Sequence, residues 1–188
     1  MPIASETQHH DNPPATSVAG GIAAFRGATD FVVEQLFPLA PGTHELMERG
    51  ANLLLADCGG GRALHRMARR FPRSRFVGID ELPWNAASAA SHARAARIGN
   101  LWIHRDSPGD FELAPVYHAV VSLDPCNGRA HDPHWIVRIA STVRPGGVLF
   151  FENDNGTARA TLIAMGFRKI CEARPANAPS RRFIVAVR

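Results

Sequence analysis

Apolar and polar positions along this chain fall into two alternating kinds of block. Short continuous apolar runs have the length of buried strands, and the segments between them carry apolar residues at helical spacing. This alternation predicts an α/β fold in which a mostly parallel sheet has helices on both faces. The predicted strands are 52–57, 75–80, 101–105, 118–123, 148–152, 168–173 and 182–187, and the predicted helices are 62–70, 84–98, 133–143 and 157–165.

The two ends of the chain depart from this alternation. The last two predicted strands are joined by a short loop containing Pro and Asn, which predicts an antiparallel hairpin at the edge of a seven-stranded sheet. Residues 1–16 are polar and aperiodic, so we expect a disordered arm before a single domain at 17–188. Before the first strand we expect a helix within 22–37 and a short one capped by Thr43 and ended by Gly50. These helices either cover a cofactor cleft or pack on the sheet.

The most informative stretch lies between the first predicted strand and the helix after it. The apolar run ends on Asp57, and Cys58, Gly59, Gly60 and Gly61 follow before helical spacing resumes. A strand, a glycine turn and a helix in succession bring bare backbone against a nucleotide-like ligand, because glycine lacks a Cβ and tolerates positive φ. The N–H groups at the start of the helix form a natural site for a carboxylate.

Two common nucleotide-binding motifs do not fit this turn. The G-x-G-x-x-G fingerprint of nicotinamide enzymes needs a glycine where Leu64 stands. A Walker A loop needs a Lys after its last glycine, and the only Lys of the chain is Lys169. The pattern Asp-x-Gly-x-Gly does fit, with Ala63 where a third glycine is often found.

Acidic residues also end the later predicted strands. Asp80 ends the second strand and is followed by Glu81 and Leu82. A carboxylate at this position can accept both hydroxyl hydrogens of a ribose. Ligands of parallel sheets lie outside the carboxyl ends of the strands, so a row of carboxylates there suits a cationic, hydroxyl-rich ligand. The polar residues at the ends of later strands are Asp106 and Ser107 after the third, Asp124 after the fourth and Glu152 on the fifth.

The succession ADCGGG, FVGID, HRDS, VVSLDP, VRPGGVLFF and AMGF resembles the class I S-adenosylmethionine (SAM) dependent methyltransferases over roughly residues 40–188. The part up to FVGID is particularly similar to bacterial methyltransferases whose catalytic domain follows a winged-helix domain. The resemblance implies a Rossmann-like class I methyltransferase fold with SAM as cofactor. The residues that it implies for cofactor binding are Asp57, Cys58, Gly59, Gly60, Gly61, Asp80, Glu81, Leu82, Asp106, Ser107, Leu123 and Asp124.

The acceptor half of the resemblance is less complete. In those bacterial enzymes, Asp-x-x-His-Asp and a Pro follow the fourth strand; here His131, Asp132 and Pro133 come after extra residues. We predict His131 as a general base, since an imidazole can take a proton from a hydroxyl or amine acceptor. The alternative is a solvated loop in which Asp132 caps a helix that begins at Pro133. Only a short interval follows Glu152 where longer relatives carry a substrate cap, so we expect neither the cap nor the winged-helix domain.

Composition narrows the class of protein only a little. The 188 residues carry a formal net charge of +4, and the surplus is almost entirely Arg. Abundant Arg, Ala and Pro are typical of a GC-rich bacterial genome, so we expect no nucleic-acid partner. One predicted helical face is dense in Arg and most simply faces solvent, with an acidic or RNA partner as the alternative. The arginines on that face are Arg62, Arg66, Arg69 and Arg70.

Three scattered cysteines without a C-x-x-C pair, no secretory signal and no membrane-length apolar run predict a cytoplasmic protein without a membrane partner. We expect no bound metal.

Together these patterns predict a small SAM-dependent methyltransferase that acts on a small-molecule O or N acceptor. Methyl transfer from a sulfonium mainly requires alignment of the nucleophile and exclusion of water, so few catalytic side chains are needed. One alternative is a catalytically inactive SAM-fold protein that serves as a binding or regulatory subunit; another is an RNA or protein methyltransferase. Besides the acceptor, we expect as partner either a second copy or a protein that supplies the missing cap.

Overall fold

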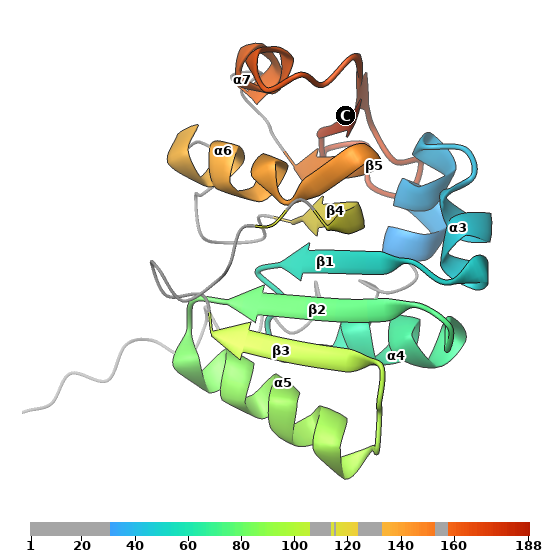
Figure 1. Ribbon diagram of the computed structural model, residues 1–188, viewed down its shortest axis with the longest axis vertical. Helices are drawn as coiled ribbons and strands as arrows, with labels where there is room; N and C mark the ends of the chain where they lie inside the picture. The colour runs from blue at the N-terminus through green and yellow to red at the C-terminus, as the bar shows by residue number, and fades with distance from the viewer. Residues whose placement is uncertain (1–30, 106–113, 115, 124–132, 153–157) are drawn as a thin grey trace, which may run out of the picture.

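The structure is a computed structural model that describes residues 31–105, 114, 116–123, 133–152 and 158–188. These residues form one mixed sheet with helices packed against it (Figure 1). The strands are β1 (Asn52–Ala56), β2 (Arg75–Asp80), β3 (Leu101–Arg105), β4 (Tyr117–Ser122), β5 (Val143–Glu152), β6 (Lys169–Ala173) and β7 (Phe183–Val187). The helices are η1 (Phe31–Leu36), η2 (Phe37–Leu39), α3 (Thr43–Arg49), α4 (Arg62–Arg70), α5 (Pro83–Ala95), α6 (Pro133–Ser141) and α7 (Ala158–Ala164).

The described sheet has seven strands in the order β3-β2-β1-β4-β5-β7-β6. All neighbours are parallel except β7, which is antiparallel to both β5 and β6. The predicted fold class and the C-terminal hairpin are therefore confirmed. Within the hairpin β7 lies inside the sheet and β6 forms its edge. Their sequences explain this order, because four of the five β7 residues are buried whereas β6 carries charged, exposed positions.

Two apolar cores lie on opposite faces of the sheet. Residues from η1, η2, α3 and α4 form the core on one face, where Leu53 of β1 and Phe150 of β5 are buried. Helices α6 and α7 cover the other face, against Leu54 of β1 and Phe151 of β5. Neighbouring residues of a strand thus point into different cores, as the pleat of a strand requires. Among the described residues, none of the helices combines the length and hydrophobicity that a bilayer crossing requires.

The described part of the segment before β1 packs on one face of the sheet. Its helix is a π-helix followed by a 3-10 turn, and Leu36 and Phe37 are buried in the first core. The predicted residues 22–30 and the N-terminal arm 1–16 lie outside the described residues. The prediction that Thr43 caps α3 is wrong: Gly42 occupies the cap with φ +87°, and the Thr43 hydroxyl donates to the carbonyl of Ala40.

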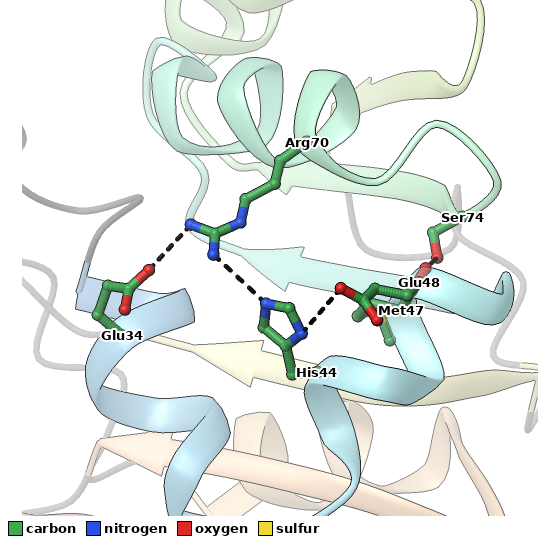
Figure 2. Close-up of polar contacts among 6 residues, drawn as sticks. All are labelled: Glu34, His44, Met47, Glu48, Arg70 and Ser74. Carbon is green, nitrogen blue, oxygen red and sulfur yellow. Dashed lines mark hydrogen bonds and ion pairs between the residues drawn. The ribbon is translucent and has the colours of Figure 1, made fainter.

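Polar contacts join α3 to the end of α4 and the start of β2 (Figure 2). The buried Ser74 hydroxyl donates to the Met47 carbonyl at 2.6 Å and accepts the Ala51 N–H at 2.9 Å. On the surface, the Arg70 guanidinium donates to Glu34 at 2.9 Å. It also lies 3.3 Å from His44. The exposed contacts contribute little to stability, so the buried serine is the main polar link in this cluster.

The strand β5 begins five residues earlier than predicted. The sequence Arg-Pro-Gly-Gly at 144–147 is typical of a turn, yet it lies within the strand as a bulge at which the register between β4 and β5 shifts. Glycine is required there, because a Cβ on Gly147 would lie 2.9 Å from the Tyr117 carbonyl oxygen. Gly146 has φ +76°, a conformation that glycine adopts readily.

Candidate functional site

The turn between β1 and α4 has three glycines with different structural roles. Gly59 and Gly61 have φ +55° and +73°, values at which a side chain is strained. A Cβ on Gly61 would also lie 2.7 Å from the Cβ of Ala89 in α5, so this glycine lets α4 and α5 approach closely. Gly60 has neither constraint, and nothing lies within 4 Å of the Cβ that it lacks. The turn therefore presents open backbone at Gly60 between two structurally required glycines.

The carboxylate of Asp80, at the end of β2, holds this turn in place. It accepts the Gly59 N–H at 2.7 Å through one oxygen. The other oxygen accepts the Leu82 N–H at 3.0 Å and the Asn85 amide at 3.1 Å. A carboxylate offers about four acceptor positions, so about one remains. Asp80 is only 4% exposed, and hence much of its hydrogen-bonding capacity organises the loop and the start of α5.

The side chain of Cys58 faces the core beneath the turn. It is 1% exposed, and its sulfur would lie 2.9 Å from a Cβ on Gly78 of β2. Burial raises the pKa of this thiol well above its ordinary value, and the carboxylates of Asp80 and Asp57 raise it further. The thiol therefore stays protonated and inert at neutral pH. Asp57 is itself buried, with φ +53° in the left-handed region.

The carboxyl end of β5 carries an ion pair that sequence analysis did not anticipate. Arg181 donates to both oxygens of Glu152, at 2.6 Å from Nε to Oε1. The guanidinium carbon also lies 4.5 Å from the ring centroid of Phe31 and 5.2 Å from that of Phe183. Glu152 is thus neutralised by an arginine that stacks on two aromatic rings. Glu152 is one of the predicted row of carboxylates, and it already has an arginine as its partner.

Several predicted site residues meet at the carboxyl edge of the sheet. Register pairs Ala56 with Ile79 and with Ser122, so the residues that follow β1, β2 and β4 emerge side by side. Of these, Glu81 is exposed, Leu82 is half-buried and Leu123 is 7% exposed. The predicted residues that lie outside the described part of the chain are Asp106, Ser107, Asp124 and the predicted base His131.

The sequence carried a weak signal for only one of the two contacts of strand-end carboxylates that were not predicted. Asn85 follows Asp80 by five residues in a helix that begins at Pro83, so its return to the strand end could have been suspected. The partner of Glu152 had no such signal, because Arg181 is distant in sequence and one of many arginines. Trp135 of α6 donates to the buried Ser122 hydroxyl at 3.4 Å, which ties α6 to the end of β4.

Comparison with known proteins gives relatives of one enzyme class. No family model matches the chain. It is 27% identical over 116 residues to the ubiquinone biosynthesis O-methyltransferase of Rhizobium johnstonii and 31% identical over 117 residues to that of Sodalis glossinidius. Each alignment covers 62% of this chain and 46% of the relative, so the chain spans about half the length of the curated relatives it matches.

Solved structures with the same fold include SAM-dependent methyltransferases. The apo form of the SAM-dependent methyltransferase SibL aligns with a TM-score of 0.66 at 13% identity, covering 92% of this chain and 57% of that one. A SAM-dependent methyltransferase from Aquifex aeolicus gives a TM-score of 0.58 at 12% identity, covering 75% and 83%. At these identities the likeness concerns the fold. The chain has the Rossmann-like fold of these methyltransferases and is similar in sequence to bacterial O-methyltransferases.

Proposed function

We propose that this chain binds SAM at the carboxyl edge of the sheet and transfers its methyl group to a hydroxyl of a small molecule. The observation that carries the proposal is the glycine turn, in which open backbone at Gly60 is held in place by Asp80. The relatives named as O-methyltransferases support a hydroxyl acceptor. When bound, SAM supplies an activated methyl group on a sulfonium.

The residues at this edge fit such a cofactor. Gly60 has room for a ligand to approach the main chain, and the remaining acceptor position of Asp80 suits one ribose hydroxyl. We assign the second ribose hydroxyl to Glu81, which is exposed beside it. The predicted contacts of Leu82 and Leu123 are apolar and suit an adenine ring. Cys58 contributes only main-chain groups, because its thiol is buried.

The acceptor would approach beside Arg181, which pairs with Glu152 and stacks on Phe31. Phe31 and Arg181 stack at the end of β5 and give that edge a flat, partly exposed wall. Such a wall suits a planar hydroxyl-bearing acceptor and orients it without donating or removing a proton. His131 stays the predicted general base.

Calorimetric titration with S-adenosylhomocysteine tests the cofactor half of the proposal. We expect saturable binding by the parent and about tenfold or weaker binding by Gly60→Ala, since the added methyl occupies the ligand's approach. Gly99→Ala is the matched control: Gly99 also has open space for a Cβ, but it lies at the amino end of β3. Absence of binding by the parent, or equal binding by both variants and the parent, would refute the assignment.

The transfer itself is tested by S-adenosylhomocysteine formation from SAM with a simple diphenol such as catechol and with related phenols and amines. Turnover with hydroxyl acceptors supports the proposal, and turnover with amines alone contradicts the hydroxyl assignment. Tight cofactor binding without turnover on any acceptor would favour the binding-subunit alternative.

A further inference from the structure

A groove lies at the amino-terminal end of β3. The glycine turn lies at the other end of the strands, after the carboxyl end of β1. Its volume is about 470 Å³, and the last turn of α5 and the first residues of β3 line it. The buried residues Ala93 and Leu101 lie on its inner side, and Trp102, which also lines it, is 45% exposed. In Figure 1 the arrowheads of β2 and β3 point away from the end at which α5 stops. The groove is therefore separate from the proposed cofactor edge.

Exposed arginines without a carboxylate partner gather around this end of the sheet. Arg94 and Arg97 line the groove itself. Other exposed arginines follow on α4, on the turn after it and at the start of β2, namely Arg69, Arg73 and Arg75. Within the described part of the chain these five form no ion pair, whereas Arg70 pairs with Glu34 and Arg181 with Glu152. Five uncompensated guanidiniums make this end of the molecule an electropositive surface.

The half-buried amide of Asn100 joins the turns that carry some of these arginines. The Asn100 side chain, just before β3, lies 2.9 to 3.3 Å from three carbonyl oxygens at the end of α4 and in the turn after it. The main-chain carbonyl of Asn100 accepts the Phe76 N–H at 2.9 Å. The turn before β2 and the turn before β3 are thus joined, and the arginines that they carry are held on one surface before any ligand binds.

Arg97, just after the end of α5, has a strained backbone conformation. The Ile98 N–H reaches the Ala93 carbonyl at 3.0 Å, which places Arg97 at the left-handed position after the helix, with φ +52°. Glycine is the usual residue there. A cation near a helix C-terminus is favourable for the dipole, but that effect does not require this strained position or the arginines on α4 and β2. Arg97 thus lines the groove from a backbone position that favours glycine.

We propose that this surface, called the basic groove and defined by Trp102 and the five arginines above, binds single-stranded nucleic acid. Trp102 pairs with Val77, on the face of β3 opposite that of Leu101 and Ile103, so its exposed indole offers a base a stacking platform at the rim of the groove and not inside it. The guanidiniums bind the flanking phosphates. A bilayer is less suited, because insertion needs protruding apolar side chains and this apolar surface is concave. A duplex is less suited, because its bases are already stacked and covered.

Fluorescence anisotropy with a 5′-labelled 12-nucleotide single-stranded RNA, over a range of KCl concentrations, tests the basic groove. We expect Arg94→Gln to weaken binding and to lower the slope of log Kd against log salt by about 0.7, the share of one phosphate contact on a single strand. Arg168→Gln is the matched control, since it removes the same charge next to β6, the opposite edge of the sheet. Arg97→Gly should weaken RNA binding without lowering the melting temperature, because glycine relieves the strained φ.

Two substitutions at Trp102 separate stacking from packing. Trp102→Ala should weaken binding about fivefold or more, whereas Trp102→Phe, which keeps an aromatic face, should stay close to the parent. The proposal is overturned if the parent does not bind the RNA, or if Arg168→Gln weakens binding as much as Arg94→Gln. It is also overturned if Trp102→Ala binds like Trp102→Phe. Binding to vesicles of phosphatidylglycerol with none to the RNA would instead assign the surface to a membrane and reject the proposal.

Discussion

Gly61→Ala should be strongly destabilising, and the structure divides its cost into two parts. The first is conformational: φ is +73° at this position, and a side chain in the left-handed region costs roughly 1–2 kcal/mol. The second is steric, because the new methyl would lie 2.7 Å from the Cβ of Ala89, a contact that forces overpacking worth roughly 1–3 kcal/mol. We therefore expect a loss of about 2–5 kcal/mol in the free energy of unfolding.

A double-mutant cycle with Ala89→Gly isolates the steric part. Ala89→Gly alone should cost about 1 kcal/mol, since it places a glycine inside α5. In the double variant the clash with Gly61→Ala disappears while the strained φ remains. The two substitutions should therefore be non-additive by about 1–3 kcal/mol in favour of the double variant. Urea denaturation with linear extrapolation measures all three variants against the parent.

Gly60→Ala is the internal control for this cycle. It lies one residue away in the same turn, has an ordinary φ and has open space for the new methyl, so its unfolding free energy should stay within about 0.5 kcal/mol of the parent. Equal losses for Gly60→Ala and Gly61→Ala would show that the turn does not have the backbone described here. Additive costs in the cycle would show that α4 and α5 do not meet at this glycine.

Two further predictions concern the side chains of Ser74 and His118. Ser74→Ala should destabilise the protein by about 2 kcal/mol in urea denaturation, because the Met47 carbonyl and the Ala51 N–H both lose their side-chain partner; a loss below 0.5 kcal/mol would contradict this. Burial, and secondarily the charge of Arg144, lowers the pKa of His118 below its usual value of 6.5, so the folded state resists protonation. Stability should then fall as the pH drops below about 6.5, less steeply in His118→Gln; parallel pH profiles for parent and variant would refute this.

Much of the fold could be predicted because strand and helix in this chain have clear periods. The ranges of α4, β2 and β3 agree with the predictions to the residue. The predictions were wrong where tertiary contacts override local preference. The bulge at Gly146 and Gly147 has a turn composition, but pairing with β4 holds it in the sheet. Thr43 is a good capping residue by type, yet a glycine with positive φ occupies the cap.

The candidate site was predictable in its main chain and less so in its side chains. The spacing of Asp57, the glycines and Asp80 follows from backbone geometry, which a motif records well. Which partners a carboxylate takes depends on residues that are distant in sequence. Asp80 turns toward Gly59 and Asn85, and Glu152 is paired by Arg181, so neither carboxylate stands free as the pattern alone suggested.

The two ends of the sheet differ in how their charged groups are paired, and this bears on how one small domain could serve two ligands. At the carboxyl end of the sheet, hydrogen bonds hold the carboxylate of Asp80 and Arg181 pairs with that of Glu152. At the amino edge the cations of the basic groove are unbalanced, and Asn100 joins the turns that carry some of them. If RNA and S-adenosylhomocysteine bind independently, each titration should be unchanged by saturating amounts of the other. If one ligand shifts the affinity for the other, the reverse shift must be equal in size. Such a shift would couple the two sites through β2 and β3, which run from the amino end of the sheet to its carboxyl end.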